Sequence, residues 1–597
     1  MSLSTIALPD AVVLQRLTLP DPEITDQTAL FVRLAGGAQV VGDRIVLPAG
    51  GAVGFDTYVN FLDLAHWQKH CHVGGLWLRL CGTGQVRLRL HDAGRPDLPA
   101  VTRTIVLHPG GVMIDLGSCL EADHSLLALH LEAQEDAHLE SGTWLTRVPD
   151  GRVPPKLAII ITTFRRETEV TRTAARIAQF LDRTGAGDTT HLFVIDNGSS
   201  ITLPAHARLS VIPNRNLGGA GGFARGLAAA QDGGWSHVLF MDDDAAFQME
   251  NLVRTRAFLH LARDPAAAVA GAMISEGRPH VMWENGAVFD RYCRPCDHGT
   301  DLRDADEVVA MLHGAPDKPA GFYGGWWFFA FPLSHVAHYP FPFFVRGDDI
   351  SFSLAHDFAC TTLNGVMSFQ EDFAVKESPQ TLYLDLRNHL HHHLTHPALE
   401  IGARAMAWLA VRFILRSLVR MHYDSATAQL LAWSDVMSGP EFFARHADMT
   451  VRRATVAALT DAETWVPCDP QTYPAPAPAT PPNRLLAYAM KLTMNGHLLP
   501  GFGWLGRRVV LGTGDRAPLW PLWGARSVRY VDSANRRTYA VHHDKRRFFA
   551  LLWHTGGHVL RWNRAYTGLL QAYRTAYPRL ASRAFWEEQF RAEEDAP

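Results

Sequence analysis

Several features that would assign this chain to a common class are missing from its sequence. Cysteine is scarce, with seven residues scattered over 597, and an odd, dispersed set does not suggest a disulfide framework. The N-terminal segment has no basic region followed by an apolar core, as a secretory signal would have. No uninterrupted apolar run reaches the roughly 18 residues that a membrane-spanning helix needs. We therefore expect a cytoplasmic protein without transmembrane helices.

A large excess of charge is also absent. The formal net charge is -4, which argues against general nucleic-acid binding. The hydrophobic fraction of 47% and the charged fraction of 19% are typical of a globular protein, and the length predicts about three domains. Cys293 and Cys296 form a CxxC pair near His298, but a fourth ligand is not evident. A loop with two free thiols is therefore favoured over a structural zinc site.

The first region, residues 1–152, contains short runs in which apolar and polar residues alternate, as in Val86–Leu90. Breaks rich in Gly, Pro and Asp separate these runs. Such a pattern indicates a sandwich or a barrel, and we predict an N-terminal β-sandwich or jelly-roll domain. We favour a structural or assembly role for this domain, and carbohydrate binding is the alternative.

The second region, residues 153–395, changes to continuous apolar strands that alternate with helical segments. Strands without polar alternation are buried on both faces, which predicts a Rossmann-like, mostly parallel sheet covered by helices. The predicted strands are 157–162, 191–196 and 238–241, and the predicted helices are 167–183 and 222–231. The third region, residues 396–597, is predicted to be mainly helical, with a Pro-rich linker at 466–483.

Polar side chains stand where the predicted strands of the second region end. Thr163 and Asp196 end two of them, and Asp242, Asp243 and Asp244 end a third. Ligands bind at this edge of such sheets. Adjacent carboxylates after a buried strand are costly unless a cation neutralises them, and oxygen ligands suit Mg²⁺ or Mn²⁺. We therefore predict a divalent metal that holds a nucleotide diphosphate; a solvated acidic loop is the alternative.

Individual positions follow from the same geometry. Asp242 and Asp244 point the same way on an extended backbone and can share the metal, while Asp243 turns towards ribose or the donor sugar. Arg165 supplies a cation near the first strand, and Asn197 beside Asp196 can bind a uracil edge or a ribose hydroxyl. The glycines at 218–222 let the backbone approach a ligand closely.

A second acidic pair, Asp348 and Asp349, follows an apolar run and Gly347. One carboxylate could accept the proton of an attacking hydroxyl while the other orients the acceptor. The alternative is helix capping, because a helix is predicted to begin near Ile350. Trp326 and Trp327 offer aromatic faces for sugar rings, with core packing as the alternative.

Taken in order, the segments NLGGAGGFARG, MDDD, GGWW and GDD resemble glycosyltransferase family 2 of the GT-A fold. Within it they are most similar to the mycobacterial polymerising galactofuranosyltransferases and their bacterial relatives. The resemblance implies UDP-galactofuranose as donor, inversion at the anomeric carbon, and a growing cell-surface glycan, in some cases lipid-linked, as acceptor.

The resemblance also implies roles for residues. Asp349 is the expected base with Asp348 assisting, and Asp242 and Asp244 are the expected metal ligands. The candidate donor-binding residues are Thr163, Arg165, Asp196, Asn197, Asn216, Gly219, Asp242 and Asp243. The candidate acceptor- or sugar-binding residues are Trp326, Trp327, Glu284 and His389. The alternative for the histidine-rich segment 387–393 is a mostly solvated helix.

One position departs from the family pattern. The family has a metal-binding histidine shortly after the acidic pair, and here Gln370 stands at that place, followed by Glu371. Gln370 or Glu371 is therefore the candidate third metal ligand. The departure keeps two other functions open: the same reaction with a different sugar nucleotide, or a non-catalytic carbohydrate-binding scaffold.

The third region carries basic residues beside Trp, Phe and Leu, as in 498–508 and 545–553. This combination predicts peripheral contact with the inner face of the plasma membrane, and a helical core with snorkelling arginines is the alternative. Either end region could also mediate assembly into a homo-oligomer.

Overall fold

The computed structural model of the chain describes residues 11–122, 124–313, 318–371, 376–469, 483–516, 518–532 and 536–591. They form two compact units. The first unit holds residues up to 215, 222–337 and 352–370, and the second unit holds 216–221, 338–351 and 371 onwards. Most of the linker predicted at 466–483 lies outside the described residues. The three-domain division stays a prediction.

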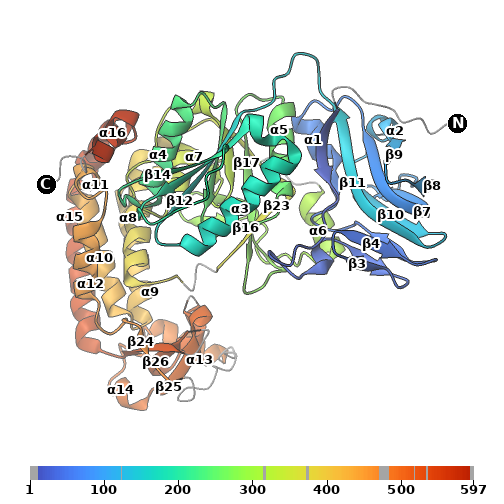
Figure 1. The fold of residues 1–597 in the computed structure, drawn as a ribbon. Helices are drawn as coiled ribbons and strands as arrows, with labels where there is room; N and C mark the ends of the chain where they lie inside the picture. Colours follow the sequence, from blue (N-terminus) through green and yellow to red (C-terminus); the bar gives the residue numbers. More distant parts are fainter. Residues whose placement is uncertain are drawn as a thin grey trace. The chain divides into compact units, whose positions relative to one another are not determined.

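The N-terminal part of the first unit is an antiparallel sheet with the strand order β2-β5-β10-β7-β11-β4-β3 (Figure 1). The strands are β1 (Ala11–Arg16), β2 (Arg33–Ala35), β3 (Gln39–Val41), β4 (Arg44–Leu47), β5 (Ala52–Gly54), β6 (Leu62–Asp63), β7 (Trp77–Asp92), β8 (Val101–Leu107), β9 (Val112–Asp115), β10 (Leu126–Ala133) and β11 (Ala137–Arg147), with helices α1 (Leu64–His70) and α2 (Gly117–Glu121) between them. The predicted β structure is confirmed. The jelly-roll form is not confirmed, because the long strand β7 pairs with β11 along its first half and with β10 along its second, which gives a single nearly barrel-like sheet.

The rest of the first unit is an α/β core built on the strand order β14-β13-β12-β15-β22-β17-β23-β16. Its strands are β12 (Leu157–Thr163), β13 (Thr190–Asp196), β14 (Leu209–Pro213), β15 (His237–Asp242), β16 (Ala246–Phe247), β17 (Ala267–Ser275), β18 (Met282–Glu284), β22 (Phe329–Pro332) and β23 (Ala359–Gln370). The helices α3 (Glu167–Thr184), α4 (Gly218–Asp232) and α5 (Glu250–Leu261) alternate with the first strands. The strands β12 to β15 pair in parallel, as predicted, whereas β22 runs antiparallel to β15 and β17.

Smaller elements complete the first unit. The strands β19 (Ala287–Phe289), β20 (Cys293–Pro295) and β21 (Phe322–Tyr323) form a three-stranded sheet. Helix α6 (Ala305–Leu312) lies between β20 and β21 in the chain. Cys293 and Cys296 are not joined in a disulfide. The N-terminal sheet packs on the α/β core through buried Arg254 of α5, whose guanidinium donates to the carbonyls of Val59 (2.7 Å) and Asn364 (2.8 Å).

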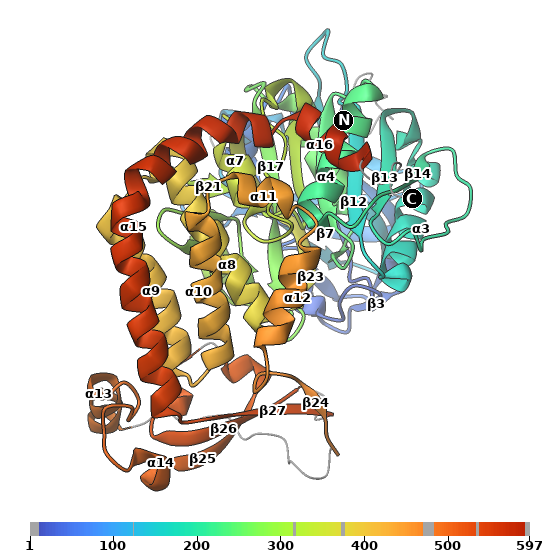
Figure 2. The ribbon, with the colours of Figure 1, turned by 90° about the vertical axis from the view of Figure 1, so that its left-hand side faces the viewer.

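The second unit is mainly helical, as predicted. Its helices are α8 (Pro379–Thr395), α9 (Ala403–Val419), α10 (Tyr423–Met437), α11 (Glu441–Arg445), α12 (Thr450–Leu459), α13 (Arg484–Leu492), α14 (Phe502–Leu505), α15 (Lys545–Leu580) and α16 (Arg583–Arg591). Helix α15 runs beside α9 and α10 (Figure 2). Within the described residues, none of the helices combines the length and hydrophobicity that a membrane-spanning segment needs.

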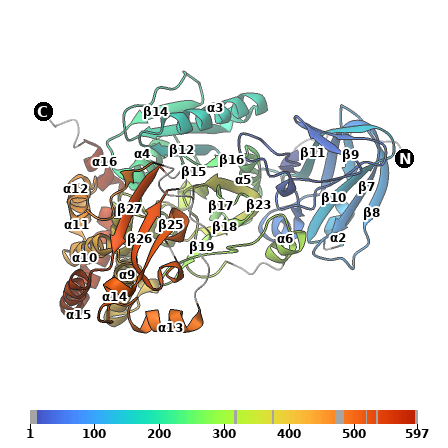
Figure 3. The same ribbon diagram turned by 90° about the horizontal axis from the view of Figure 1, so that it is seen from below.

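The second unit also contains a sheet that the sequence analysis did not predict (Figure 3). Its strands are β24 (Val466–Pro467), β25 (Arg507–Gly512), β26 (Ala525–Val531) and β27 (Arg537–His542). The short helix α7 (Asp348–Leu354) begins in this unit, at the second acidic pair.

Candidate active site

The strand ends of the first unit bring several predicted site residues to one edge of the sheet. Thr163 of β12 is paired with Asp196 of β13, and Thr162 is paired with Asp242 of β15. These strands end together because they are parallel and in register. Asp243 and Asp244 follow directly on the turn after β15. The predicted meeting of Thr163, Asp196 and the aspartate triplet is therefore present in the fold.

The aspartates at this edge face a cation that the sequence analysis did not single out. Arg166 Nη1 lies 2.5 Å from Asp244 Oδ2 and 3.4 Å from Asp243 Oδ1. Burial raises the pKa of Asp243 to about 6, against the opposing effect of Arg166. The candidate Arg165 is exposed, with its guanidinium 5.1 Å from the Phe164 ring. Arg166 could have been considered from the sequence, because it directly follows Arg165 in the segment after β12.

Asp196 and Asn197 are buried and engaged within the protein. The Asp196 carboxylate accepts from the backbone N–H groups of Gly198 (2.9 Å) and Ile201 (2.7 Å). Asn197 Nδ2 donates to Thr162 Oγ1 at 3.1 Å, and its Oδ1 accepts from Asn214 Nδ2 at 2.8 Å. These bonds fix the loop that follows β13, so its shape is set by polar side chains rather than by apolar packing.

Gln370 is the last residue of β23 and is only 3% exposed. It is paired in register with Ser275 at the end of β17. No hydrogen-bond partner exists for the Nε2 of Gln370 among the described residues. Glu284 is buried in β18, opposite Met273 of β17, whereas the other candidate ligand, Glu371, is exposed.

The two candidate tryptophans are both buried. The Trp326 ring makes edge contacts with Phe223 (4.8 Å between centroids) and Phe240 (5.0 Å). The indole N–H of Trp327 donates to the carbonyl of Gly271 at 2.9 Å. The rings therefore form part of the aromatic core of the first unit, while the Nε1 of Trp326 has no hydrogen-bond partner in the described part of the chain.

The second unit brings together the start of α4 and the second acidic pair. A Cβ on Gly219 would lie 3.3 Å from Asp348 Oδ2, and one on Gly218 would lie 2.1 Å from the Phe344 carbonyl oxygen. Gly218 also has a φ of +69°. Only glycine fits at position 218, because a side chain would collide with that carbonyl. Asn216 accepts from the N–H of Gly218 at 3.2 Å and so shapes the same turn.

Asp348 and Asp349 open helix α7. The Asp349 carboxylate accepts from the N–H of Ile350 at 2.8 Å, and burial raises the pKa of Asp349 to about 6. A carboxyl group with a pKa near 6 can hold a proton at mildly acid pH and accept one at neutral pH, as a general base must. The capping alternative describes part of the geometry but does not account for this raised pKa.

His389 lies on α8, where its Nδ1 contacts the carbonyl oxygen of Asp385 at 2.7 Å. Burial lowers the pKa of His389 to about 4, so the ring is neutral at physiological pH. The solvated-helix alternative for the segment 387–393 is wrong, because nearly all of these side chains are buried. His389 is the partly buried member of this segment, and α8 packs against α9, α10, α12 and α15.

The divalent metal implied by the family pattern was tested against the residues present. Asp242 and Asp244 provide hard oxygen atoms, and Gln370 could add an amide oxygen. However, Asp244 is paired with Arg166, and across the described ranges no group of three or more His, Cys, Asp or Glu side chains is arranged to hold a metal ion. The two carboxylates suit a metal whose other ligands come from the diphosphate or from neutral groups.

Comparison with known proteins agrees with this arrangement. Residues 158–292, which contain the strand ends and the aspartate triplet, match the model of the family described as Glycosyl transferase family 2. The chain is a glycosyltransferase, and this part of it is similar to that family.

It resembles Galactofuranosyltransferase GlfT2 of Mycobacterium tuberculosis (strain ATCC 25618 / H37Rv), with 24% identity over 598 residues and 90% of each chain covered. GlfT2 of Mycolicibacterium smegmatis is 24% identical over 427 residues, which cover 65% of this chain and 64% of the relative. Among solved structures, the mannosyltransferase PcManGT from Pyrobaculum calidifontis matches with a TM-score of 0.25 and 15% identity, over 52% of this chain and 84% of that one.

Proposed function

We propose that this glycosyltransferase transfers galactofuranose from UDP-galactofuranose to a growing cell-surface glycan, with inversion at the anomeric carbon. The observation that carries the proposal is the presence of two acidic groups with different surroundings. One stands at the ends of parallel strands beside Arg166, and the other contains the half-buried Asp349, whose pKa is raised to about 6. The likeness to GlfT2 over 90% of the chain supports the choice of donor.

The reaction assigns a role to each group. The Asp349 carboxylate accepts the proton of the acceptor hydroxyl, whose oxygen forms a bond to the anomeric carbon while the bond from that carbon to the UDP oxygen breaks. Asp348 orients the acceptor. We assign donor binding to Thr163, Asp196, Asn197, Asn216, Gly219, Asp242 and Asp243, with Arg165 and Arg166. We assign binding of the sugar and the acceptor to Glu284, Trp326, Trp327 and His389.

Asp242 and Asp244 would hold a divalent cation, Mn²⁺ or Mg²⁺, with Gln370 or Glu371 as the third protein ligand. When bound, such a cation neutralises charge that develops on the departing diphosphate. Arg166 contributes to the same neutralisation, which its 2.5 Å contact with the Asp244 carboxylate supports.

A membrane surface is the proposed partner of the second unit, on the cytoplasmic face, where a lipid-linked acceptor would be presented. Helix α14 carries Trp504 (88% exposed) and Leu505 (83%), and α15 exposes Trp553 (82%). Helix α13 buries Met490 on one face and exposes Leu485, Tyr488 and Leu492 on the other, an apolar surface without a protein partner in the described residues. Basic residues such as Lys491 and Lys545 accompany these side chains, as in interfacial helices.

The central experiment measures UDP release by the purified protein with UDP-galactofuranose and a galactofuranosyl acceptor, with and without Mn²⁺. We expect acceptor-dependent release that Mn²⁺ stimulates. Release with another sugar nucleotide but not with this one would keep the reaction class and overturn the donor. Absence of release with every donor would favour the carbohydrate-binding scaffold instead.

The membrane proposal is tested by co-sedimentation with vesicles that contain anionic lipid. We expect the full chain to bind the vesicles and the variant Trp504→Ser/Leu505→Ser/Trp553→Ser to bind at least about tenfold more weakly. The reason is that each large apolar side chain that leaves water for the lipid contributes strongly to the free energy of membrane binding. Equal binding by both proteins would reject this surface. Size-exclusion chromatography with light scattering on the same samples tests the proposed homo-oligomer.

A further inference from the structure

The segment Phe343–Gly347, directly before Asp348 and Asp349, has an unusual backbone. Phe344 (φ +75°), Arg346 (φ +70°) and Gly347 (φ +80°) all adopt left-handed conformations. Residues with side chains rarely occupy this region, and they remain there only where the surroundings hold them. The direction in which the chain enters α7, and hence the position of Asp349, depends on these dihedral angles.

Four consecutive carbonyl groups of this segment have identified hydrogen-bond donors. The Phe343 carbonyl accepts from Arg387 Nη2, and the Phe344 carbonyl accepts from the N–H of Ala220 at 3.1 Å. The next two share one donor group, because Asn388 Nδ2 donates to the Val345 carbonyl at 3.1 Å and to the Arg346 carbonyl. Side chains of α8 therefore replace the bonds that regular secondary structure would supply.

Side-chain contacts hold the same segment. Arg346 Nη1 lies 3.1 Å from Asp385 Oδ1, on α8, and the Arg453 guanidinium lies 5.0 Å from the Phe344 ring centroid. Below Gly347, His392 Nε2 stands 2.7 Å from where a Cβ would be. Arg346 and Gly347 thus contact α8, whereas Phe344 contacts α12 (Thr450–Leu459) through Arg453.

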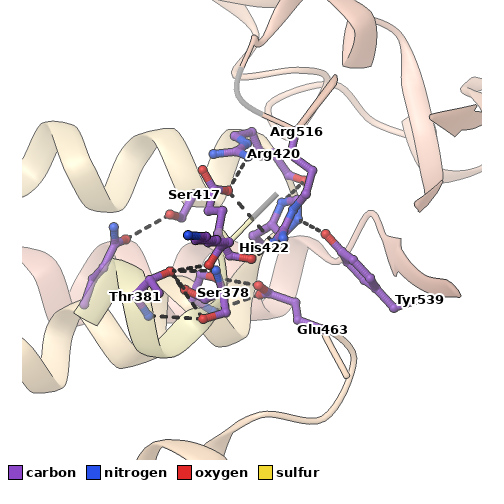
Figure 4. Close-up of polar contacts among 12 residues, drawn as sticks. Ser378, Thr381, Ser417, Arg420, His422, Glu463, Arg516 and Tyr539 are labelled. Atoms are coloured by element: carbon purple, nitrogen blue, oxygen red, sulfur yellow. Dashed lines mark hydrogen bonds and ion pairs between the residues drawn. The ribbon is translucent and has the colours of Figure 1, made fainter. Parts of the chain in front are cut away.

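Helix α8 is itself firmly anchored. At its start, Ser378 and Thr381 form a capping box, in which Thr381 N donates to Ser378 Oγ at 3.2 Å (Figure 4). Just before it, Glu377 receives Arg420 Nη2 at 2.6 Å. Asn388 is 1% exposed, and its Oδ1 accepts from Arg387 Nε at 2.9 Å, which fixes the direction of its amide. A helix so fixed can transmit a defined geometry to the segment that it contacts.

We propose that Asn388 is a positioning residue for the reaction: its amide holds Val345 and Arg346 in the conformation that places the Asp349 carboxylate for proton transfer. This inference rests on the proposed function. Without the amide, both carbonyls lose their donor. Fewer bonds then hold the left-handed φ angles of the segment, and its backbone can relax to more common φ angles. A displacement of about 1 Å at a catalytic group can cost about 10²-fold in rate.

The test compares two buried asparagines that each donate to two backbone carbonyls. Asn388→Leu removes the bonds described above. Asn364→Leu, the matched control in the first unit, removes bonds to the carbonyls of Tyr58 (3.2 Å) and Phe61 (2.7 Å). Unfolding temperature, kcat, KM for the donor, the pH dependence of kcat, and hydrogen exchange of the peptide 343–350 are measured for both variants.

We expect Asn388→Leu to lower kcat by about 10²-fold, to change the donor KM by less than about threefold and to displace the acid limb of the kcat profile. Amide exchange in 343–350 should rise in this variant alone. Asn364→Leu should keep kcat and the pH profile even where it lowers the unfolding temperature. Equal kcat and equal pH profiles in the two variants would overturn the inference.

A second substitution covers the case in which Asn388→Leu does not fold. Asn388→Asp keeps the size of the side chain and the oxygen that accepts from Arg387, but it loses both donated bonds. It should show the same loss of kcat, and full activity of this variant would equally overturn the role of Asn388. Failure of the wild-type protein to transfer any sugar would instead overturn the proposed function on which the inference rests.

Discussion

The acidic groups Asp242–Asp244 and Asp348–Asp349 carry the same side chains in two different settings. The triplet follows a buried strand whose neighbours fix its position through the sheet register, and Arg166 lies within 2.5 Å of Asp244. The pair follows a left-handed segment that α8 holds by side-chain bonds to backbone carbonyls. Burial raises the pKa to about 6 in each group, at Asp243 and at Asp349.

The difference teaches how the two groups can serve different steps. A carboxylate beside an arginine is suited to a site where charge must be neutralised, because the cation can be shared with an anionic ligand. A half-buried carboxyl such as that of Asp349, which accepts the backbone N–H of Ile350, is suited to exchange a proton. Changing one group while the other remains intact tests this division of roles.

The largest effect is expected at the proposed base. Asp349→Asn removes the proton acceptor but keeps the size of the side chain, so kcat should fall by about 10³-fold. The Kd for UDP should change by less than about threefold, because the base contacts the acceptor rather than the nucleotide. Turnover is measured by UDP release and binding by calorimetry.

The control for this variant is Asp357→Asn, a substitution of an exposed aspartate that pairs with His335. It should leave both quantities unchanged. If Asp349→Asn retained wild-type turnover, the base would have to be another group.

The second effect concerns the strand-end group. Asp244→Asn weakens the proposed cation site, and we expect the Mn²⁺ concentration for half-maximal activity to rise by about 10-fold to 100-fold. The activity at saturating Mn²⁺ should recover in part. Asp188→Asn, at a highly exposed aspartate, is the matched control. An unchanged Mn²⁺ response in Asp244→Asn would mean that this carboxylate does not bind the cation.

The two settings also differ in how far the sequence predicts them. The strands β12, β13 and β15 begin or end within one residue of their predicted bounds, because uninterrupted apolar runs such as Ile159–Ile161 leave few alternatives. The placement of Thr163, Asp196 and Asp242 at one edge then follows from parallel pairing. Arg166 was missed because neither spacing nor composition distinguishes it from Arg165; only the direction of the backbone after β12 does.

The surroundings of Asp349 could not be predicted in the same way. Its position depends on left-handed angles at Phe344 and Arg346, where nothing in the residue type signals such a conformation. The side-chain donors of the segment, Arg387 and Asn388, come from α8, about forty positions later in the chain, and the Phe344 carbonyl accepts from Ala220, far earlier in the chain. The four-stranded sheet that contains β26 was missed for a related reason. Its strands are short, and some of the paired strands are separated in the chain by helices and irregular segments.

The third prediction uses pH to tell the two acidic groups apart. With a pKa raised to about 6, Asp349 is deprotonated above that pH and protonated below it, so a base role requires kcat to fall on the acid side. Between pH 7 and pH 5 the loss should approach about tenfold. In Asp243→Asn, which removes the other carboxyl with a raised pKa, the acid limb should persist. Disappearance of the limb in that variant would assign it to Asp243 instead.

The smallest effect separates two neighbouring arginines. Arg166→Gln removes the cation next to Asp243 and Asp244, and we expect the donor KM to rise by about tenfold, because charge-assisted bonds to phosphate are strong. Arg165→Gln removes an exposed guanidinium and should raise the donor KM by less than about threefold. Both values come from UDP release at saturating acceptor. The reverse order would return the nucleotide contact to Arg165, whose positive φ of 56° already shows that the turn after β12 is held in a specific conformation.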